Sequence, residues 1–270
     1  MASSAGSAAD GTGEGPGDDR LAAALRDWLG RWPPESALDV VGSGLRTEPG
    51  WDGRVHPAVG VASPEAMVLS VPPDRVDRVA ELVPGGSLNG PRLRAGLGAA
   101  GGRPRRRCVE WVFRWSTEPA ALPEAGVWVA ADGAGVPAWL RPFGGEVLVA
   151  FDDSGHHLGG VGIKRHTAVT HELAVAVANQ ARGRGLGRRL VAQAARRVLD
   201  GGVVPLYMHA RVNVGSSRLA EAAGFADRGW HMYELADEPQ PLPHRLAGRG
   251  RTLLRGWTRR PPLAPPSRSN

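Results

Sequence analysis

The sequence contains very little cysteine and very little lysine. Its 270 residues include one cysteine, Cys108, which excludes an internal disulfide framework and a zinc site built from cysteines. All of its 33 basic residues except Lys164 are arginine. We attribute this bias to a GC-rich genome, because arginine codons can be GC-rich and lysine codons are not. The eight histidines show no metal-ligand spacing, so no metal site is expected.

Long apolar runs are also missing. No stretch approaches the roughly 20 apolar residues that a membrane span requires. The first residues have neither the basic region nor the apolar core of a secretion signal. We therefore expect a cytoplasmic protein that does not contact a membrane. Glycine and proline are abundant instead, with 38 and 23 residues, and the apolar share of 42% is sufficient for a buried core.

The formal charge of +6 is distributed unevenly along the chain. Residues 1–19 carry four acids and no base, whereas residues 236–270 are rich in arginine and proline. We interpret both segments as disordered tails, since neither has the apolar periodicity of a packed element. Between them we predict an N-terminal region of unknown role at 20–107 and a second domain at 108–235, separated by a Gly/Arg-rich loop at 98–107.

Hydrophobic periodicity predicts an α/β chain with mixed elements. Helices are expected over residues 20–31, 73–83, 91–97, 186–199 and 215–223. Strands are expected over residues 66–71, 109–115, 127–131, 146–151, 159–164, 172–178, 204–210 and 229–235. The stretch 35–62 shows mixed patterns and no clear period, so no element is predicted there.

One strand–loop–helix segment has the features of a binding site for phosphate groups. A glycine-rich loop joins the expected strand that ends at Ala178 to the expected helix that begins at Leu186. Glycines allow the backbone to approach a phosphate, and a helix N-terminus offers unpaired N–H groups. Four arginines between 182 and 189 add charge, so we expect a di- or polyphosphate ligand. A Walker loop is excluded because the segment has no lysine, and a dinucleotide fingerprint fails because Arg188 occupies its third glycine position.

The remaining pattern is Arg-x-x-Gly-x-Gly at residues 182–187. It resembles the pyrophosphate loop of the GNAT superfamily, the acyl-CoA-dependent N-acyltransferases. That superfamily also shows Asn-x-x-Ala-x-x-Leu-Tyr-x-x-x-Gly-Phe at a similar distance downstream. The residues of this chain that fall in register with it are Asn213, Leu219, Gly224 and Phe225. The resemblance covers about residues 126–235.

The resemblance implies a mixed, mostly antiparallel sheet flanked by helices, here with an additional N-terminal α/β region. It also implies an N-acetyltransferase that moves an acetyl group from acetyl-CoA to an amine by direct attack in a ternary complex. Acyl-CoA would lie where two neighbouring strands splay apart. The residues implied to bind it are Val175, Ala176, Val177, Arg182, Gly183, Arg184, Gly185, Leu186, Gly187, Asn213 and Ser216.

The resemblance further implies a general base and a proton donor for the leaving thiolate. His171 and Glu172 are the candidate bases, and strand alternation sends their side chains to opposite faces. We favour Glu172 on residue type. The tyrosine that often protonates the thiolate in this superfamily is replaced by Ala220. The candidates to substitute for it are Tyr207, His209 and Tyr233.

Two alternative functions stay open. The missing tyrosine would also suit a catalytically degenerate module that binds acyl-CoA as a sensor. The basic tail would suit nucleic acid, but its one aromatic residue is Trp257, so nucleic acid is not an expected partner. Nine tryptophans could line a pocket for an aromatic or cationic amine, or form core. The acceptor (a small amine, a protein N-terminus or a lysine), the acyl chain and a homodimer are left open.

Overall fold

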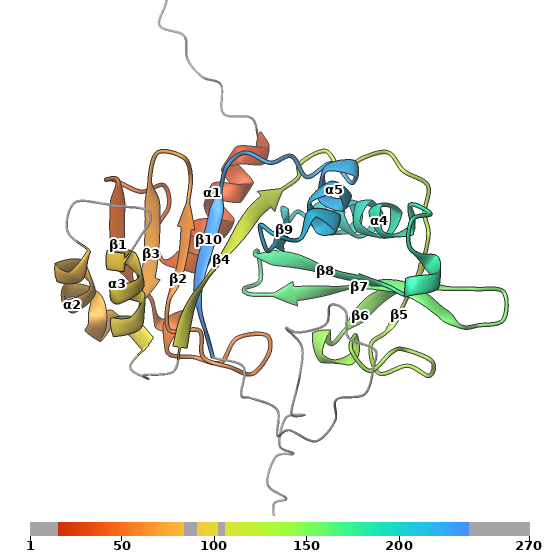
Figure 1. The fold of residues 1–270 in the computed structure, drawn as a ribbon, viewed down its shortest axis with the longest axis horizontal. Helices are drawn as coiled ribbons and strands as arrows, with labels where there is room; N and C mark the ends of the chain where they lie inside the picture. The colour runs from red at the N-terminus through yellow and green to blue at the C-terminus, as the bar shows by residue number, and fades with distance from the viewer. Residues whose placement is uncertain (1–15, 84–90, 102–105, 238–270) are drawn as a thin grey trace, which may run out of the picture.

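A single ten-stranded sheet runs through the protein (Figure 1). The computed structural model describes residues 16–83, 91–101 and 106–237. The strand order is β1-β3-β2-β10-β4-β9-β8-β7-β6-β5. Among these strands the pairs β1–β3 and β8–β9 are parallel, and the other neighbouring pairs are antiparallel. The mixed, mostly antiparallel sheet that the resemblance implies is therefore confirmed.

The bounds of the elements are as follows. The strands are β1 (Leu38–Gly42), β2 (Val59–Ala62), β3 (Met67–Val71), β4 (Arg106–Trp115), β5 (Val127–Ala130), β6 (Glu146–Phe151), β7 (His157–Arg165), β8 (His171–Val177), β9 (Pro205–His209) and β10 (His231–Asp237). The α-helices are α1 (Pro16–Leu29), α2 (Val76–Leu82), α3 (Pro91–Gly101), α4 (Leu186–Asp200) and α5 (Val214–Ala222). The short 3-10 helices are η1 (Gly44–Arg46), η2 (Pro73–Arg75), η3 (Arg141–Phe143) and η4 (Asn179–Ala181). None of the helices in the described ranges is both long and apolar enough to cross a membrane.

Helices cover both faces of the sheet, because alternate residues of each strand point to opposite sides. We call face A the side on which α2 and α3 pack against β2 and β3, and α4 and α5 pack against β7, β8 and β9. Face B is the opposite side, where α1 packs against the central strands and η3 against β6. The core of face B contains the tryptophans Trp28, Trp32, Trp115 and Trp230. Much of the tryptophan content is therefore structural.

The last strand joins the two parts of the chain. β10 lies between β2 and β4, so that Glu234 stands opposite Val59 on one side and Val109 on the other. The boundary predicted between residues 107 and 108 falls inside β4. Backbone hydrogen bonds of a continuous sheet thus connect the N-terminal region to the segment with the motifs. The proposed division into domains stays a prediction.

A buried arginine fastens α5 to this sheet. Arg114 of β4 is 2% exposed and points to face A. Its guanidinium donates to Glu221 at 2.8 Å, to Ser217 at 2.9 Å, to Asp227 at 3.0 Å and to the carbonyl of Phe225 at 2.9 Å. Two carboxylates compensate the charge, which buried cations require. The helix and the turn after it are therefore held at a defined place on β4.

Between the two predicted tails, the predicted elements agree with the structure except at two missed strands and one predicted loop. Strands β1 and β2 lie in the stretch 35–62 and were missed, because β2 is buried on both faces and shows no alternation. The loop predicted at 98–107 is partly wrong, since α3 continues to Gly101 and β4 begins at Arg106. Burial of Leu97 and Ala100 on face A offsets the low helix propensity of the nearby glycines. Residues 102–105 lie outside the described residues.

The predicted tails differ from the structure at their inner ends. Helix α1 begins at Pro16, within the segment predicted as an acidic tail. Strand β10 extends to Asp237, within the segment predicted as a basic tail. Residues 1–15 and 238–270, including Trp257, lie outside the described residues.

Candidate active site

The sheet opens between two neighbouring parallel strands. β8 and β9 pair at two positions, the second of which is Glu172 opposite Leu206. β8 nevertheless continues to Val177, and β9 continues to His209. Over this part β8 remains paired with β7 on its other side. Among the described strands, the edge of β8 that faces β9 thus has no partner beyond Glu172, and its backbone groups can bond to an extended ligand.

The glycine-rich loop follows directly on the open end of β8. Gly183 and Gly185 have φ values of 75° and 73°, and Gly185 is the N-cap of α4. Glycine adopts this left-handed conformation without steric cost. Arg182 and Arg184 are exposed beside them. The first turn of α4 contains no acidic residue, so the partial positive charge of the helix N-terminus is available to an anion.

The loop and the downstream motif contact each other. A Cβ atom on Gly187 would come within 2.6 Å of Leu219 Cδ1, so α4 and α5 approach each other closely at this glycine. Gly224 has a φ of 92°, and a Cβ there would lie 2.7 Å from the backbone nitrogen of Ala120. Phe225 is completely buried beneath α4 and α5. These motif positions therefore set how the two helices pack.

Asn213 and Ser216 form the beginning of α5. Asn213 is the N-cap, and its Oδ1 accepts a hydrogen bond of 3.1 Å from the backbone N–H of Ser216. The Ser216 hydroxyl lies 2.7 Å from the phenol oxygen of Tyr207 on β9. Burial raises the pKa of Tyr207, so the phenol keeps its proton at neutral pH. Ala220, in contrast, is fully buried in the core of face A.

The two candidate bases have different surroundings. Glu172 lies on face B, 4% exposed, and is bonded to Lys164 Nζ and, at 3.0 Å, to His166 Nε2. Burial alone would raise the pKa of Glu172, but Lys164 and His166 outweigh it and lower the pKa to about 2. Both carboxylate oxygens are engaged, and such a weakly basic group accepts a proton poorly near pH 7. His171 is half-buried, and burial followed by the charge of Arg165 lowers its pKa.

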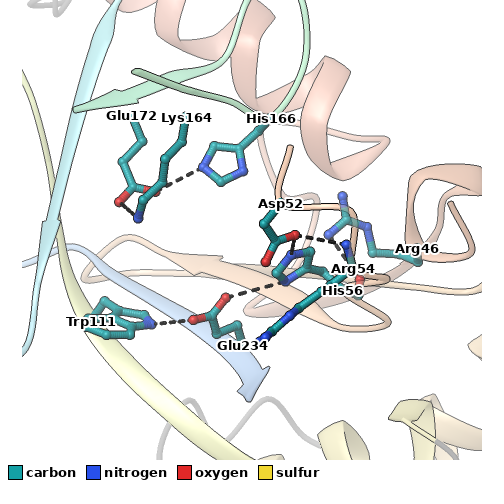
Figure 2. A network of polar contacts seen from close by, with 9 residues as sticks. All are labelled: Arg46, Asp52, Arg54, His56, Trp111, Lys164, His166, Glu172 and Glu234. Atoms are coloured by element: carbon teal, nitrogen blue, oxygen red, sulfur yellow. Dashed lines mark hydrogen bonds and ion pairs between the residues drawn. The ribbon is translucent and has the colours of Figure 1, made fainter. Parts of the chain in front are cut away.

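A second polar group lies on face B with Glu172 (Figure 2). The loop between η1 and β2 carries Asp52 and His56, whose Oδ1 and Nε2 atoms are 3.1 Å apart. His56 Nδ1 lies 3.8 Å from Glu234 Oε2, and Trp111 Nε1 donates to Glu234 Oε1 at 2.9 Å. We define the face-B cluster as the residues Asp52, His56, Trp111, Lys164, His166, Glu172 and Glu234.

The loop that carries Asp52 and His56 is anchored at both ends. Arg46 is 3% exposed and donates to the carbonyl of Trp28 at 3.1 Å and to that of His56 at 3.5 Å. The first of these carbonyls belongs to the last turn of α1, where a cation is favoured by the helix dipole. Trp51 lies under Lys164, with Nζ 5.6 Å from its ring centroid. Contacts with α1 and with β7 therefore hold the loop in place.

Sequence reasoning did not find the contribution of the N-terminal region to this face. Asp52 and His56 lie in the stretch without a clear period, and Glu234 was assigned only to a final strand. Their association depends on β10 entering the sheet beside β2, which no local pattern indicates. The contact of Lys164 with Glu172 could have been found, since both predicted strands belong to one antiparallel pair.

Comparison with known proteins finds a family match for the segment that contains the glycine loop and the downstream motif. Residues 107–225 match the family model described as "Acetyltransferase (GNAT) family". No curated protein matches the sequence.

Solved structures with a similar arrangement include an acetyltransferase of the GNAT family from Colwellia psychrerythraea, which is 16% identical with a TM-score of 0.38. That match covers 48% of this chain and 56% of the other, so the chain spans just over half of its length. A GCN5-related N-acetyltransferase-like protein from Streptococcus suis is 14% identical over 66% of this chain and 83% of the other, with a TM-score of 0.39. Residues 107–225, which match the model of the GNAT acetyltransferase family, include the glycine loop, the downstream motif and the strands β5 to β9.

Proposed function

We propose that the protein is an N-acetyltransferase that moves the acetyl group of acetyl-CoA to an amine by direct attack in a ternary complex. The observation that carries this proposal is the divergence of β8 and β9 directly before the loop 182–187. The edge of β8 that diverges from β9, at Val175, Ala176 and Val177, would bind the pantetheine arm as a strand binds its neighbour. The N–H groups of the loop and of the first turn of α4 would hold the pyrophosphate.

Several features of the loop support this role. Gly183 and Gly185 keep side chains away from the backbone groups that would face the phosphates. Arg182 and Arg184 are exposed and would add charge-assisted hydrogen bonds. Arg182 Nε also donates to the carbonyl of Val177 at 3.1 Å, which ties the loop to the end of β8.

In the proposed reaction the acceptor nitrogen loses a proton and attacks the thioester carbonyl. The C–N bond forms, the C–S bond breaks, and the departing thiolate takes up a proton. The general base stays open between the two candidates on β8: Glu172 lies on face B with a lowered pKa, and the neutral ring of His171 points to the opposite face. Glu172 would stabilise positive charge at the point where the strands diverge. Ser216, bonded to Tyr207, would serve as the proton donor that position 220 lacks.

Acetyl-CoA binding is tested first by thermal unfolding. A ligand at 100 times its Kd stabilises the folded state by about 2.7 kcal/mol, so millimolar acetyl-CoA should raise the Tm by several degrees. Release of free CoA is then measured with a broad panel of amines. An unchanged Tm at millimolar acetyl-CoA would overturn the proposal.

Stabilisation by acetyl-CoA without CoA release would favour the acyl-CoA sensor instead. Neither that alternative nor nucleic-acid binding gains support from the family match, and nearly all of the basic tail lies outside the described residues. We also propose that the protein is located in the cytoplasm.

A further inference from the structure

The face-B cluster is open to a ligand at one of its ends. The side chains of Asp52, His56 and Glu234 are between 21% and 28% exposed, whereas Glu172 and His166 are more deeply buried. Figure 2 shows the two groups on the same side of the sheet, with Glu172, Lys164 and His166 in one group and Asp52, His56, Trp111 and Glu234 in the other. The exposed end is thus supplied by the N-terminal loop, β4 and β10.

The charges of the cluster are unequally compensated. Lys164 and His166 satisfy both oxygens of Glu172. Asp52 Oδ1 lies 3.1 Å from His56 Nε2 and accepts a hydrogen bond from the backbone N–H of Arg54. Among the described residues, Glu234 accepts one side-chain hydrogen bond, from Trp111 to Oε1. In the described ranges, the ring nitrogen nearest to its Oε2 is His56 Nδ1 at 3.8 Å, which exceeds hydrogen-bond distance.

Trp111 therefore holds Glu234 in place, while part of the hydrogen-bonding capacity of its carboxylate stays unused. The bond from Trp111 fixes its orientation, and Oε2 accepts no hydrogen bond from the part of the chain that the structure describes. A partly exposed carboxylate beside an indole ring is suited to an organic cation, which gains both a charge-assisted hydrogen bond and contact with the aromatic ring.

We infer that Glu234 binds a second, non-reacting cationic group of the acceptor, so that the preferred substrate is a diamine or polyamine. The inference rests on the proposed function, because it names the class of amine that the same site takes. A carboxylate beside an ammonium group stabilises the protonated form. This opposes attack by the nitrogen that must react, and it benefits a nitrogen that serves only for binding.

The anchored loop supports the same assignment. Arg46 and Trp51 hold the segment around Asp52 and His56 against α1 and β7. The carboxylates at the exposed end are thus preorganised, which reduces the entropy lost on binding a flexible amine. The N-terminal region would in this way determine acceptor specificity, while residues 107–225 supply the donor site.

The test compares the wild-type protein with Glu234→Gln, which preserves shape and the acceptor for Trp111. Alkyl monoamines and α,ω-diaminoalkanes of increasing chain length serve as acceptors. We expect the wild type to favour diamines, and Glu234→Gln to raise the KM for the best diamine about 10- to 100-fold. The KM values for monoamines and for acetyl-CoA should not change. Glu118→Gln, a neutralised glutamate in an exposed position, is the matched control.

Binding is measured separately, as the Tm shift caused by the same diamine in the presence of CoA. Trp111→Phe is the second variant, since it removes the hydrogen bond that orients Glu234 and should weaken diamine binding less than Glu234→Gln does. Turnover with equal diamine KM values in the wild type and Glu234→Gln would overturn the inference and leave the acetyltransferase proposal standing. Diamine stabilisation that Glu234→Gln abolishes, without turnover of any amine, would support the site and contradict the transferase. Absence of both turnover and diamine stabilisation would overturn both.

Discussion

The two faces of the sheet beside the β8–β9 divergence are built from different kinds of contact. On face A the glycine loop, α4 and α5 come from one continuous stretch, and they meet where Gly187 approaches Leu219. On face B the cluster joins residues far apart in the chain, such as Trp111 and Glu234, which are separated by 123 positions. The proposed donor side is thus built from neighbouring elements, whereas the proposed acceptor side requires strands from both parts of the chain. A protein built in this way can change its acceptor without altering its donor site.

The largest expected effect comes from adding one charge on face A. Asn and Asp both tolerate the left-handed conformation of Gly185 better than other side chains with a Cβ. Gly185→Asp and Gly185→Asn therefore differ mainly in charge. A carboxylate about 4 Å from a phosphate costs about 4 kcal/mol at an effective dielectric constant of 20. We expect Gly185→Asp to weaken acetyl-CoA binding at least 100-fold relative to Gly185→Asn, measured by calorimetric titration.

The same pair of variants tests whether the two faces are independent. Diamine binding at Glu234 should be equal in Gly185→Asp and Gly185→Asn, since that carboxylate lies on the other face. Equal affinity of the two variants for acetyl-CoA would show that the phosphates do not lie at this loop.

The difference between the faces also explains what the sequence could predict. The strand, the glycine loop and the helix around Gly185 follow from local patterns, and so does the cap at Asn213. The position of β10 between β2 and β4 does not, because strand order depends on long-range pairing that no short motif encodes. Glu234 was accordingly placed in a strand, but its neighbours Trp111 and His56 were not predicted.

An effect of intermediate size is expected for Glu172, on the free energy of unfolding and its dependence on pH. Its pKa is about 2 in the folded protein and 4.5 for the unperturbed group. The stabilisation is therefore fully present above about pH 4.5 and is lost as the pH falls toward 2, a difference of about 3 kcal/mol. Urea unfolding of the wild type should show this loss. Glu172→Gln should be less stable at pH 7 and should change less with pH over this interval.

Two comparisons make the Glu172 result specific. Glu118→Gln should behave as the wild type, because Glu118 is exposed and outside the cluster. Acetyl-CoA should still raise the Tm of Glu172→Gln, because the proposed binding site consists of the loop and the edge of β8. A parallel pH dependence in wild type and Glu172→Gln would contradict the ion-pair account of this carboxylate.

The smallest effect separates the structural from the binding role of Asn213. Its Oδ1 caps α5, and loss of a cap in Asn213→Ala should cost about 1 kcal/mol of stability. Asp is an equally good cap, so Asn213→Asp should unfold at the wild-type urea concentration. If the side-chain amide also donates to acetyl-CoA, Asn213→Asp loses that donor and places a negative charge near the cofactor. Weakened acetyl-CoA binding by a fully stable Asn213→Asp would assign Asn213 to the donor site, whereas unchanged binding would restrict it to capping α5.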